Sequence, residues 1–374
     1  MRAYLDHAST SPLRPAARDA MLEWLSCADP GRVHTEGRMA RAALEQARES
    51  VAAFFGTRPR QVVFTSGGTE AVNSAVFAAL WGRSDTRAVV PGVEHSAVRE
   101  ACLRWSSEVI WTKVGPDGRA DLSAIQEAVA AGGVGLVNCQ AGNHEVGTLQ
   151  PVEQLAGLLQ GGSALLHVDA AAAAGHVPLS FDGSGIDLMS VSAHKLGGPA
   201  GIGALLVRRG LRLPALLVGG EQERARRAGL ENVAAAAGFG AAAAELASSL
   251  AAEEAAARRR AERLRAAAGG IAGAVVHGPA DATLRLPHIV CLALPDVEAE
   301  PILIGLDRAG VAAHSGSSCS SESLEPSPVL AAMGADAERS LRLSVGWSTT
   351  DEEVELAARA LPEVVSGLRA LRGS

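Results

Sequence analysis

The sequence has few cysteines, and none of them is spaced as a zinc ribbon or a disulfide framework requires. Five cysteines are spread over 374 residues, with no Cys-x-x-Cys pair. An odd number at wide spacing argues against the small disulfide-rich class and against a zinc ribbon. We therefore expect a protein of a reducing compartment, the cytoplasm.

The sequence also lacks long apolar runs and an excess of positive charge. No stretch approaches the roughly 18 apolar residues of a membrane span, and residues 1–10 lack the apolar stretch of a signal peptide. The formal net charge is −7, from 34 basic and 41 acidic residues, which gives no overall attraction to nucleic acid or anionic lipid. We therefore expect no membrane insertion, no direct nucleic-acid binding, and a small-molecule partner.

Length and composition indicate a folded protein with more than one domain. Hydrophobic residues make up 48% of the chain and charged residues 20%, which allows a sizeable core and excludes a fibrous or disordered protein. At about 150 residues per domain, a chain of this length predicts two to three domains.

Short apolar runs alternate with helical patterns over the first two thirds of the chain. Runs that are apolar on both faces are typical of buried strands in a mostly parallel sheet. We predict strands at residues 61–65, 87–90, 108–112, 134–138, 164–169, 187–192 and 202–207. The alternation of strands and helices predicts a doubly wound α/β domain.

The pattern changes after Gly229. A long helix rich in alanine, glutamate and arginine is predicted to run to about Ala268. Three further strands are predicted after it, at residues 274–277, 288–294 and 341–345.

Thr350 and Glu353 have the spacing of a capping box and predict the start of a last helix. We place a large α/β domain at residues 15–245 and a smaller α/β domain at residues 246–374, which residues 1–14 join.

A glycine-rich segment and a lysine each follow a predicted strand. Residues 65–70, Thr-Ser-Gly-Gly-Thr-Glu, open a helix, where backbone amides and hydroxyls can hold a phosphate. Lys195 lies in a short turn before two glycines, in a chain whose basic residues are mostly arginine. A desolvated lysine can act as the nucleophile of Schiff-base chemistry. A plain glycine turn and a surface lysine are the alternative interpretations.

Two further candidates lie at the carboxyl ends of predicted strands. Asp169 ends one strand, and open α/β sheets bind their ligands at this edge. His95 follows Glu94 shortly after the strand at 87–90 and can stack on a flat ring or move protons. A purely structural histidine is the alternative.

Cys319 lies in a segment of small polar residues, 315–321, that cannot form a core. Free cysteines are usually buried, so a thiol in a polar segment indicates function. The other four cysteines have apolar or helical surroundings and are expected to be unreactive packing residues: Cys27, Cys102, Cys139 and Cys291.

Taken in order, these motifs resemble those of the pyridoxal-phosphate-dependent cysteine desulfurases of the class V aminotransferase family. The resemblance covers almost the whole chain, at residues 4–8, 65–70, 94–95, 143–147, 167–169, 192–195, 222–224, 315–319 and 342–344. It implies the α/β fold of the fold-type I transferases, with a large doubly wound sheet domain and a smaller domain that carries Cys319. It also implies pyridoxal 5′-phosphate as the cofactor.

The resemblance implies roles for single residues. Lys195 would bind the cofactor covalently and remove the Cα proton, and Asp169 would keep the pyridine nitrogen protonated. His95 would stack on the ring and move protons. The phosphate would be held by Gly68, Thr69, Ser192 and His194.

The resemblance also implies how substrate is used. Arg342 would bind the carboxylate of L-cysteine, a task suited to a bidentate guanidinium, although an ordinary strand-edge arginine is the alternative. Cys319 would take the sulfur as a persulfide and leave L-alanine. The long segment between these residues resembles the longer-loop group, whose loop passes sulfur to an acceptor protein.

A homodimer is implied as well. The destination of the sulfur is left open between iron–sulfur cluster assembly, tRNA thiolation, DNA modification and specialised metabolites.

Three positions depart from the family pattern. Ala172 stands where a glutamine usually contacts the phenolic oxygen of the cofactor, and His144 stands where an asparagine contacts that oxygen or the substrate. We hypothesise that His144 donates to the phenolic oxygen instead. Leu230 replaces a threonine that reaches the phosphate of the neighbouring subunit, which predicts weaker cofactor retention.

Two other functions remain possible from the sequence. One is a class V aminotransferase, a selenocysteine lyase or a carbon–sulfur lyase in which Cys319 is incidental. The other is a catalytically decayed scaffold protein, suggested by Ala172 and Leu230. The presence of Lys195 and Asp169 argues against decay.

Overall fold

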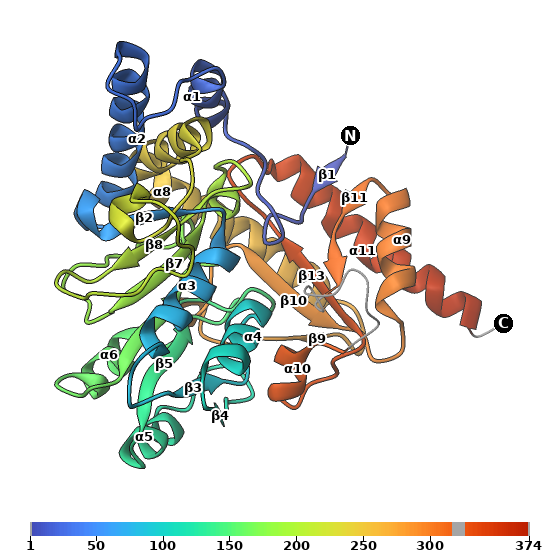
Figure 1. Ribbon diagram of the computed structural model, residues 1–374. Coiled ribbons are helices and arrows are strands. Elements are labelled where there is room, and N and C mark those ends of the chain that lie inside the picture. Colours follow the sequence, from blue (N-terminus) through green and yellow to red (C-terminus); the bar gives the residue numbers. More distant parts are fainter. Residues whose placement is uncertain (1, 316–325, 373–374) are drawn as a thin grey trace.

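The computed structural model describes residues 2–315 and 326–372, and within them the chain forms a large and a smaller part (Figure 1). The large part is built on a seven-stranded sheet and the smaller part on a four-stranded sheet. The predicted nucleophile Cys319 lies outside the described residues.

The seven-stranded sheet is mostly parallel, as the sequence predicts. Its strands are β2 (Val62–Thr65), β3 (Arg87–Pro91), β4 (Glu108–Thr112), β5 (Val134–Gln140), β6 (Leu165–Asp169), β7 (Leu188–Ser192) and β8 (Gly203–Val207). They lie in the order β2-β8-β7-β6-β5-β3-β4, and β8 alone runs antiparallel to its two neighbours. The fold class is therefore confirmed.

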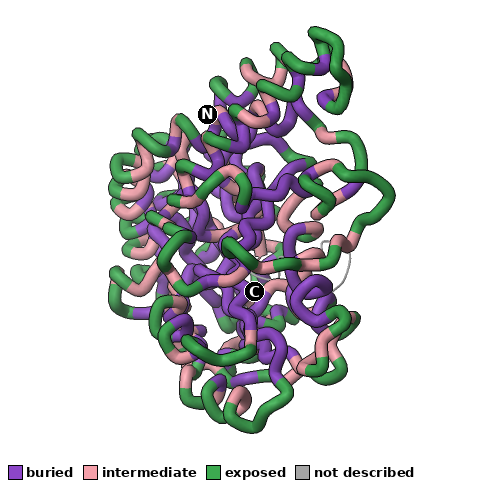
Figure 2. Tube along the Cα trace, turned by 60° about the vertical axis from the view of Figure 1, so that its left-hand side comes forward, coloured by how far each residue is buried: buried purple, intermediate pink, exposed green. Residues whose placement is uncertain are grey.

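Helices cover both faces of this sheet. One face packs against α3 (Gly68–Leu80) and α4 (Ser96–Trp105). The other face packs against α2 (Thr35–Phe54), α5 (Leu122–Ala130), α6 (Val152–Leu159) and the first half of α8 (Val233–Gly269), with α1 (Pro15–Trp24) outside α8. Figure 2 shows the resulting buried interior.

The smaller part has its own sheet and core. Its strands are β9 (Val275–Val276), β10 (Ile289–Ala293), β12 (His314–Ser315) and β13 (Ser340–Ser344), and they pair antiparallel in the order β12-β13-β10-β9. The core includes residues of the second half of α8, α9 (Ala299–Arg308) and α11 (Asp351–Arg372). The remaining short helices are α7 (Gln222–Ala225) and α10 (Pro328–Ala332).

The amino-terminal segment belongs to this smaller part. β1 (Ala3–Tyr4) pairs in parallel with β11 (Val311–Ala312), and Ala3 and Leu5 lie in the smaller core (Figure 1). The chain then crosses to the large part at α1, so residues 6–14 run between the two parts.

Helix α8 joins the two parts. Leu246 packs in the large core and Ala257 in the smaller one, so the predicted boundary at residue 245 falls inside a continuous helix and stays a prediction. By length and composition the helix could span a membrane, with mean hydropathy 1.4 over its most apolar window, but 56% of that window is buried in protein. A core helix has this character.

The predicted capping box at the last helix is confirmed. Thr350 N donates to Glu353 Oε2 at 2.6 Å, and Glu353 N donates to Thr350 Oγ1 at 3.2 Å.

Candidate active site

A cavity of about 600 Å³ lies at the carboxyl edge of the seven-stranded sheet. This is the edge at which open α/β sheets bind ligands. Every predicted site residue within the described part of the chain lines the cavity: Gly68, Thr69, His95, His144, Asp169, Ser192, His194, Lys195 and Arg342.

Lys195 is placed by a single 3₁₀ turn, η2 (Ala193–Leu196), that follows β7. Gly197 ends the turn with φ 86°, and a Cβ there would lie 2.7 Å from Arg14 Cγ, so the position requires glycine. The Lys195 amine donates to the carbonyls of Ala8 and Ser9, the latter at 2.9 Å. The amino-terminal segment therefore forms a wall of the cavity and holds the lysine.

Asp169, the last residue of β6, stands at the end of a hydrogen-bonded row across three strands. Its Oδ1 accepts from the backbone of Ala171 at 3.0 Å and from Ser190 Oγ at 3.2 Å. Ser190 Oγ also lies 3.2 Å from His167 Nε2, and His167 Nδ1 lies 2.9 Å from Asn138 Oδ1. Burial lowers the pKa of His167 to about 4, so this ring is neutral at neutral pH. The row fixes the orientation of the carboxylate.

His95 is fixed by the start of α4. Its Nδ1 accepts from the backbone N–H of Ala97 at 3.1 Å, so in the neutral ring the hydrogen resides on Nε2. The ring meets His144 edge to face, with centroids 5.0 Å apart and an interplanar angle of 73°. His95 is thus a preoriented donor at the wall of the cavity.

The glycine-rich segment brings a helix terminus to the cavity. A Cβ on Gly68, the first residue of α3, would lie 3.2 Å from the Cβ of Ser192. Burial, assisted by Lys195, lowers the pKa of His194 to about 4, and its Nδ1 lies 3.1 Å from Thr10 Oγ1. Hydroxyls, a neutral imidazole and a helix N-terminus together suit a phosphate.

Arg342 reaches the cavity from β13 of the smaller part and is 1% exposed. Nη1 donates to the carbonyl of His144 at 2.9 Å. Nη2 donates to Asp6 Oδ1 at 3.1 Å and to Ser9 Oγ at 2.6 Å. The guanidinium is therefore a fixed cation at the junction of the two parts.

Glu94 is a buried acid behind the cavity. Its Oε1 accepts from the backbone of Gln140 at 2.7 Å, and Oε2 has no partner among the described residues. Burial, with a contribution from Asp169, raises the pKa of Glu94 to about 8, so the carboxyl is mostly protonated at neutral pH.

The residues fit pyridoxal 5′-phosphate. The cavity offers an amine at Lys195, a carboxylate at Asp169 and an anion-binding helix terminus at Thr69, which match an aldehyde, a ring nitrogen and a phosphate. The volume lies in the range of small-molecule pockets, about 300–1,000 Å³.

The three positions that depart from the family pattern lie at or beside the cavity. Ala172 and His144 both line the cavity. Leu230 is 65% exposed and lines a neighbouring cavity of about 220 Å³, which shares Ser66 and Gly201 with the first.

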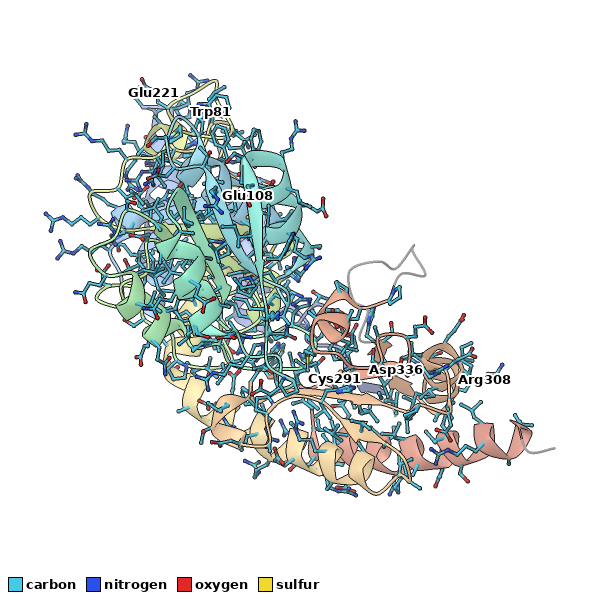
Figure 3. All side chains as sticks on the ribbon, turned by 90° about the horizontal axis from the view of Figure 1, so that it is seen from below. Trp81, Glu108, Glu221, Cys291, Arg308 and Asp336 are labelled. Atoms are coloured by element: carbon cyan, nitrogen blue, oxygen red, sulfur yellow. The ribbon has the colours of Figure 1, made fainter. Side chains whose placement is uncertain are left out.

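The cysteine predictions hold for three of four residues. Cys102, Cys139 and Cys291 are buried, and burial raises the pKa of each thiol, to about 12 for Cys102 and Cys291. Cys291, labelled in Figure 3, packs with Val93 between the two parts of the molecule. The prediction is wrong for Cys27, which is exposed beyond the end of α1.

Sequence reasoning missed two features. The first is that Ser9 and Thr10 line the cavity. The only feature of the sequence that could have indicated this is their position directly after the motif at residues 4–8. The second is a left-handed turn at Glu223, Arg224 and Ala225, with φ of 49°, 60° and 59°. The turn contains no glycine that would reveal it in the sequence. A buried bidentate ion pair from Arg48 to Glu223, at 2.6 and 2.7 Å, stabilises its left-handed backbone instead.

Comparisons with known proteins agree with one another. The chain matches the family Aminotransferase class-V over residues 3–356. A cysteine desulfurase of Trichormus azollae is 38% identical over 378 residues, covering 98% of this chain and 94% of the relative. A solved NifS-like protein has a TM-score of 0.90 and 27% identity, covering 98% of this chain and all of the other. A structure of SspA in complex with cysteine has a TM-score of 0.81 and 26% identity, over 93% and 100%.

Proposed function

The chain belongs to the class V aminotransferase family, among its cysteine desulfurases, and from this we propose that it takes sulfur from L-cysteine and releases L-alanine. The observation that carries the proposal is the convergence of Lys195, Asp169 and Arg342 on one cavity. These three groups match an amine-reactive carbonyl, a ring nitrogen and a substrate carboxylate.

Pyridoxal 5′-phosphate, when bound, supplies an electron-withdrawing ring that stabilises negative charge at the substrate Cα. Lys195 would bind it covalently, Asp169 would pair with its ring nitrogen, and the start of α3 would hold its phosphate with Thr69, Ser192 and His194. His144 would donate to its phenolic oxygen, since Ala172 offers no hydrogen bond there.

Proton transfer falls to two residues. The amine of Lys195 removes the Cα proton, because its short turn keeps it inside the cavity. His95 holds a hydrogen on Nε2 and can return a proton to the substrate carbon as the sulfur leaves.

Sulfur transfer falls to Cys319. Its thiolate attacks the sulfur of bound L-cysteine, a sulfur–sulfur bond forms, and the carbon–sulfur bond breaks with its electron pair left on the substrate. Protonation of that carbon and return of a proton to Cα give L-alanine, and the persulfide on Cys319 carries the sulfur to an acceptor.

The proposal is tested with the purified protein, pyridoxal 5′-phosphate and L-cysteine in the presence of a thiol reductant. We expect L-alanine and sulfide in equal amounts, loss of both in Lys195→Arg and loss of sulfide release in Cys319→Ser. Pyruvate in place of L-alanine would instead indicate a carbon–sulfur lyase, and full turnover by Cys319→Ser would remove that residue from the mechanism.

The chain is also proposed to act in the cytoplasm as a homodimer. Met39 on α2 and Leu230 are exposed, and ion pairs from Arg41 to Glu231 and from Arg224 to Glu45 hold these segments together. Exposed apolar side chains on these two segments suit contact with a second copy of the chain. Light scattering of the purified protein measures the oligomeric state.

A further inference from the structure

The guanidinium of Arg342 already has ligands from the amino-terminal segment. An arginine has five N–H donors. In Arg342, both hydrogens of Nη2 are in use, one on Asp6 Oδ1 at 3.1 Å and one on Ser9 Oγ at 2.6 Å. One hydrogen of Nη1 is on the carbonyl of His144. Nε is buried and has no acceptor among the described residues.

This arrangement leaves no edge free for a bidentate carboxylate. A carboxylate binds the fork through two neighbouring nitrogens, either Nε with Nη2 or Nη1 with Nη2, because Cδ blocks the third side. Both edges need a hydrogen of Nη2. A substrate carboxylate must therefore displace either Asp6 or Ser9. A carboxylate on the edge formed by Nε and Nη2 would also give the unpaired Nε–H an acceptor.

The two internal ligands differ in what their displacement costs. Asp6 is charged, and its side chain is 18% exposed beside a guanidinium that is 1% exposed. Displacing Asp6 would take a charged partner away from a buried guanidinium, whereas displacing Ser9 removes only an uncharged hydroxyl. Ser9 is the cheaper group to displace.

Ser9 also has a second partner. Its Oγ lies 2.8 Å from Asp6 Oδ1, to which the hydroxyl donates. After leaving Nη2 the hydroxyl keeps this bond to Asp6. Asp6 is itself held by a backbone bridge to Ser344, so it stays in place as the orienting acceptor.

We propose that the Ser9 hydroxyl occupies the carboxylate position on Arg342 Nη2 and is displaced by the substrate carboxylate, while Asp6 stays and orients the guanidinium. Ser9 is then a residue that sets the affinity for amino-acid substrates. The inference rests on the proposed function, since it takes Arg342 as the carboxylate ligand.

The test is Ser9→Ala in the cofactor-loaded protein, with KM for L-cysteine and Kd for L-alanine as readouts. Removing the hydroxyl frees one hydrogen of Nη2, so both constants fall by roughly two- to tenfold, the equivalent of one hydrogen bond. kcat changes far less, because the group does not touch the reacting atoms. The Kd comes from calorimetry and does not depend on turnover.

Ser11→Ala is the matched control. Ser11 lies in the same segment, but its hydroxyl pairs with His7 Nδ1 at 2.9 Å and does not contact Arg342. We expect its KM and Kd to equal those of the wild type. An equal fall in Ser11→Ala would mean that loosening the segment, and not the freed donor, causes the effect, and would overturn the proposal.

Asp6→Asn separates the two possible displaced groups. If Asp6 stays, the variant loses the charged acceptor that orients the guanidinium, and KM rises. A lower KM in Asp6→Asn with an unchanged KM in Ser9→Ala would show that Asp6 leaves, against the proposal. If the wild type does not desulfurate L-cysteine at all, the proposed function fails first, and the two failures are distinguishable.

Discussion

Lys195 is one of two lysines in the chain, and the other, Lys113, is exposed and lines no part of the cavity. This scarcity makes covalent chemistry at a lysine easy to assign. We expect borohydride reduction of the cofactor-loaded protein to place the cofactor mass on the peptide that contains Lys195. Lys113→Arg should leave the labelling unchanged and Lys195→Arg should abolish it. Labelling at Lys113 would contradict the assignment.

The raised pKa of Glu94 predicts how the stability of the protein depends on pH. The pKa of this carboxyl is raised to about 8 in the folded protein, against about 4.3 in an unfolded chain, so between these values the folded state holds the extra proton. Stability therefore falls as pH rises through this window. Glu94→Gln mimics the protonated carboxyl, so its melting temperature should match the wild type near pH 4 and exceed it by a growing margin as pH rises to about 8. Equal melting temperatures at about pH 8 would show that Glu94 ionises without cost.

Asp169 and Lys195 could be placed from the sequence, because their motifs tie each residue type to the carboxyl end of a strand. Asp169 and Lys195 follow such strands directly. Ser9 could not be placed, since its role depends on residues 6–10 crossing between two parts that are far apart in the chain. A serine after a motif carries no signal of the guanidinium that it contacts.

At the scale of elements, the turn η2 decides where the lysine lies. Gly197→Ala forces a left-handed alanine, at a cost of about 1–2 kcal/mol, and puts its Cβ against Arg14. Arg14 cannot yield, because Leu196 O, Glu245 and Glu253 hold its guanidinium at 2.6–3.0 Å. We expect a loss of stability larger than the backbone cost alone, together with weaker cofactor binding.

Gly161→Ala is the control for this variant. Gly161 has φ 80°, but a Cβ there meets nothing within 4 Å. Chemical denaturation should show only the backbone cost for Gly161→Ala and a larger loss for Gly197→Ala. Equal losses would mean that the contact with Arg14 contributes nothing.

The strands of the large sheet and the long helix α8 follow from apolar runs and composition, so the sequence predicts them within a few residues. The pairing of β1 with β11 does not, because each strand is two residues long and its partner lies 308 positions away. The left-handed turn at Glu223 is likewise set by a distant partner, Arg48. Local pattern carries no information about either contact.

At the scale of the whole molecule, neutral buried or half-buried histidines should make the fold sensitive to acid. Burial is the main cause that lowers the pKa of six of them: His7 to about 3, His167, His176 and His194 to about 4, His277 below its usual value and His288 well below it. Unfolded histidines titrate near pH 6.5, so below that pH the unfolded state binds protons that the folded state does not. We expect the melting temperature to fall steadily from about pH 6.5 to pH 4.5. Glu94 opposes the trend, but it is a single group against six.

His176→Phe isolates part of this effect. The His176 ring stacks on His288 with centroids 3.5 Å apart, and phenylalanine keeps a ring there without a titrating nitrogen. The melting temperature of the variant should depend less on pH than that of the wild type. An unaltered slope in His176→Phe would count against the histidine account.

The central claim is that sulfur from L-cysteine is transferred to Cys319, and one measurement tests it directly. The cofactor-loaded protein is mixed with L-cysteine without a reductant, alkylated and analysed by peptide mass spectrometry. The account predicts one added sulfur atom on the peptide that contains Cys319 and an equal amount of L-alanine. L-Alanine without sulfur on Cys319, or sulfur on the exposed Cys27 instead, would contradict it.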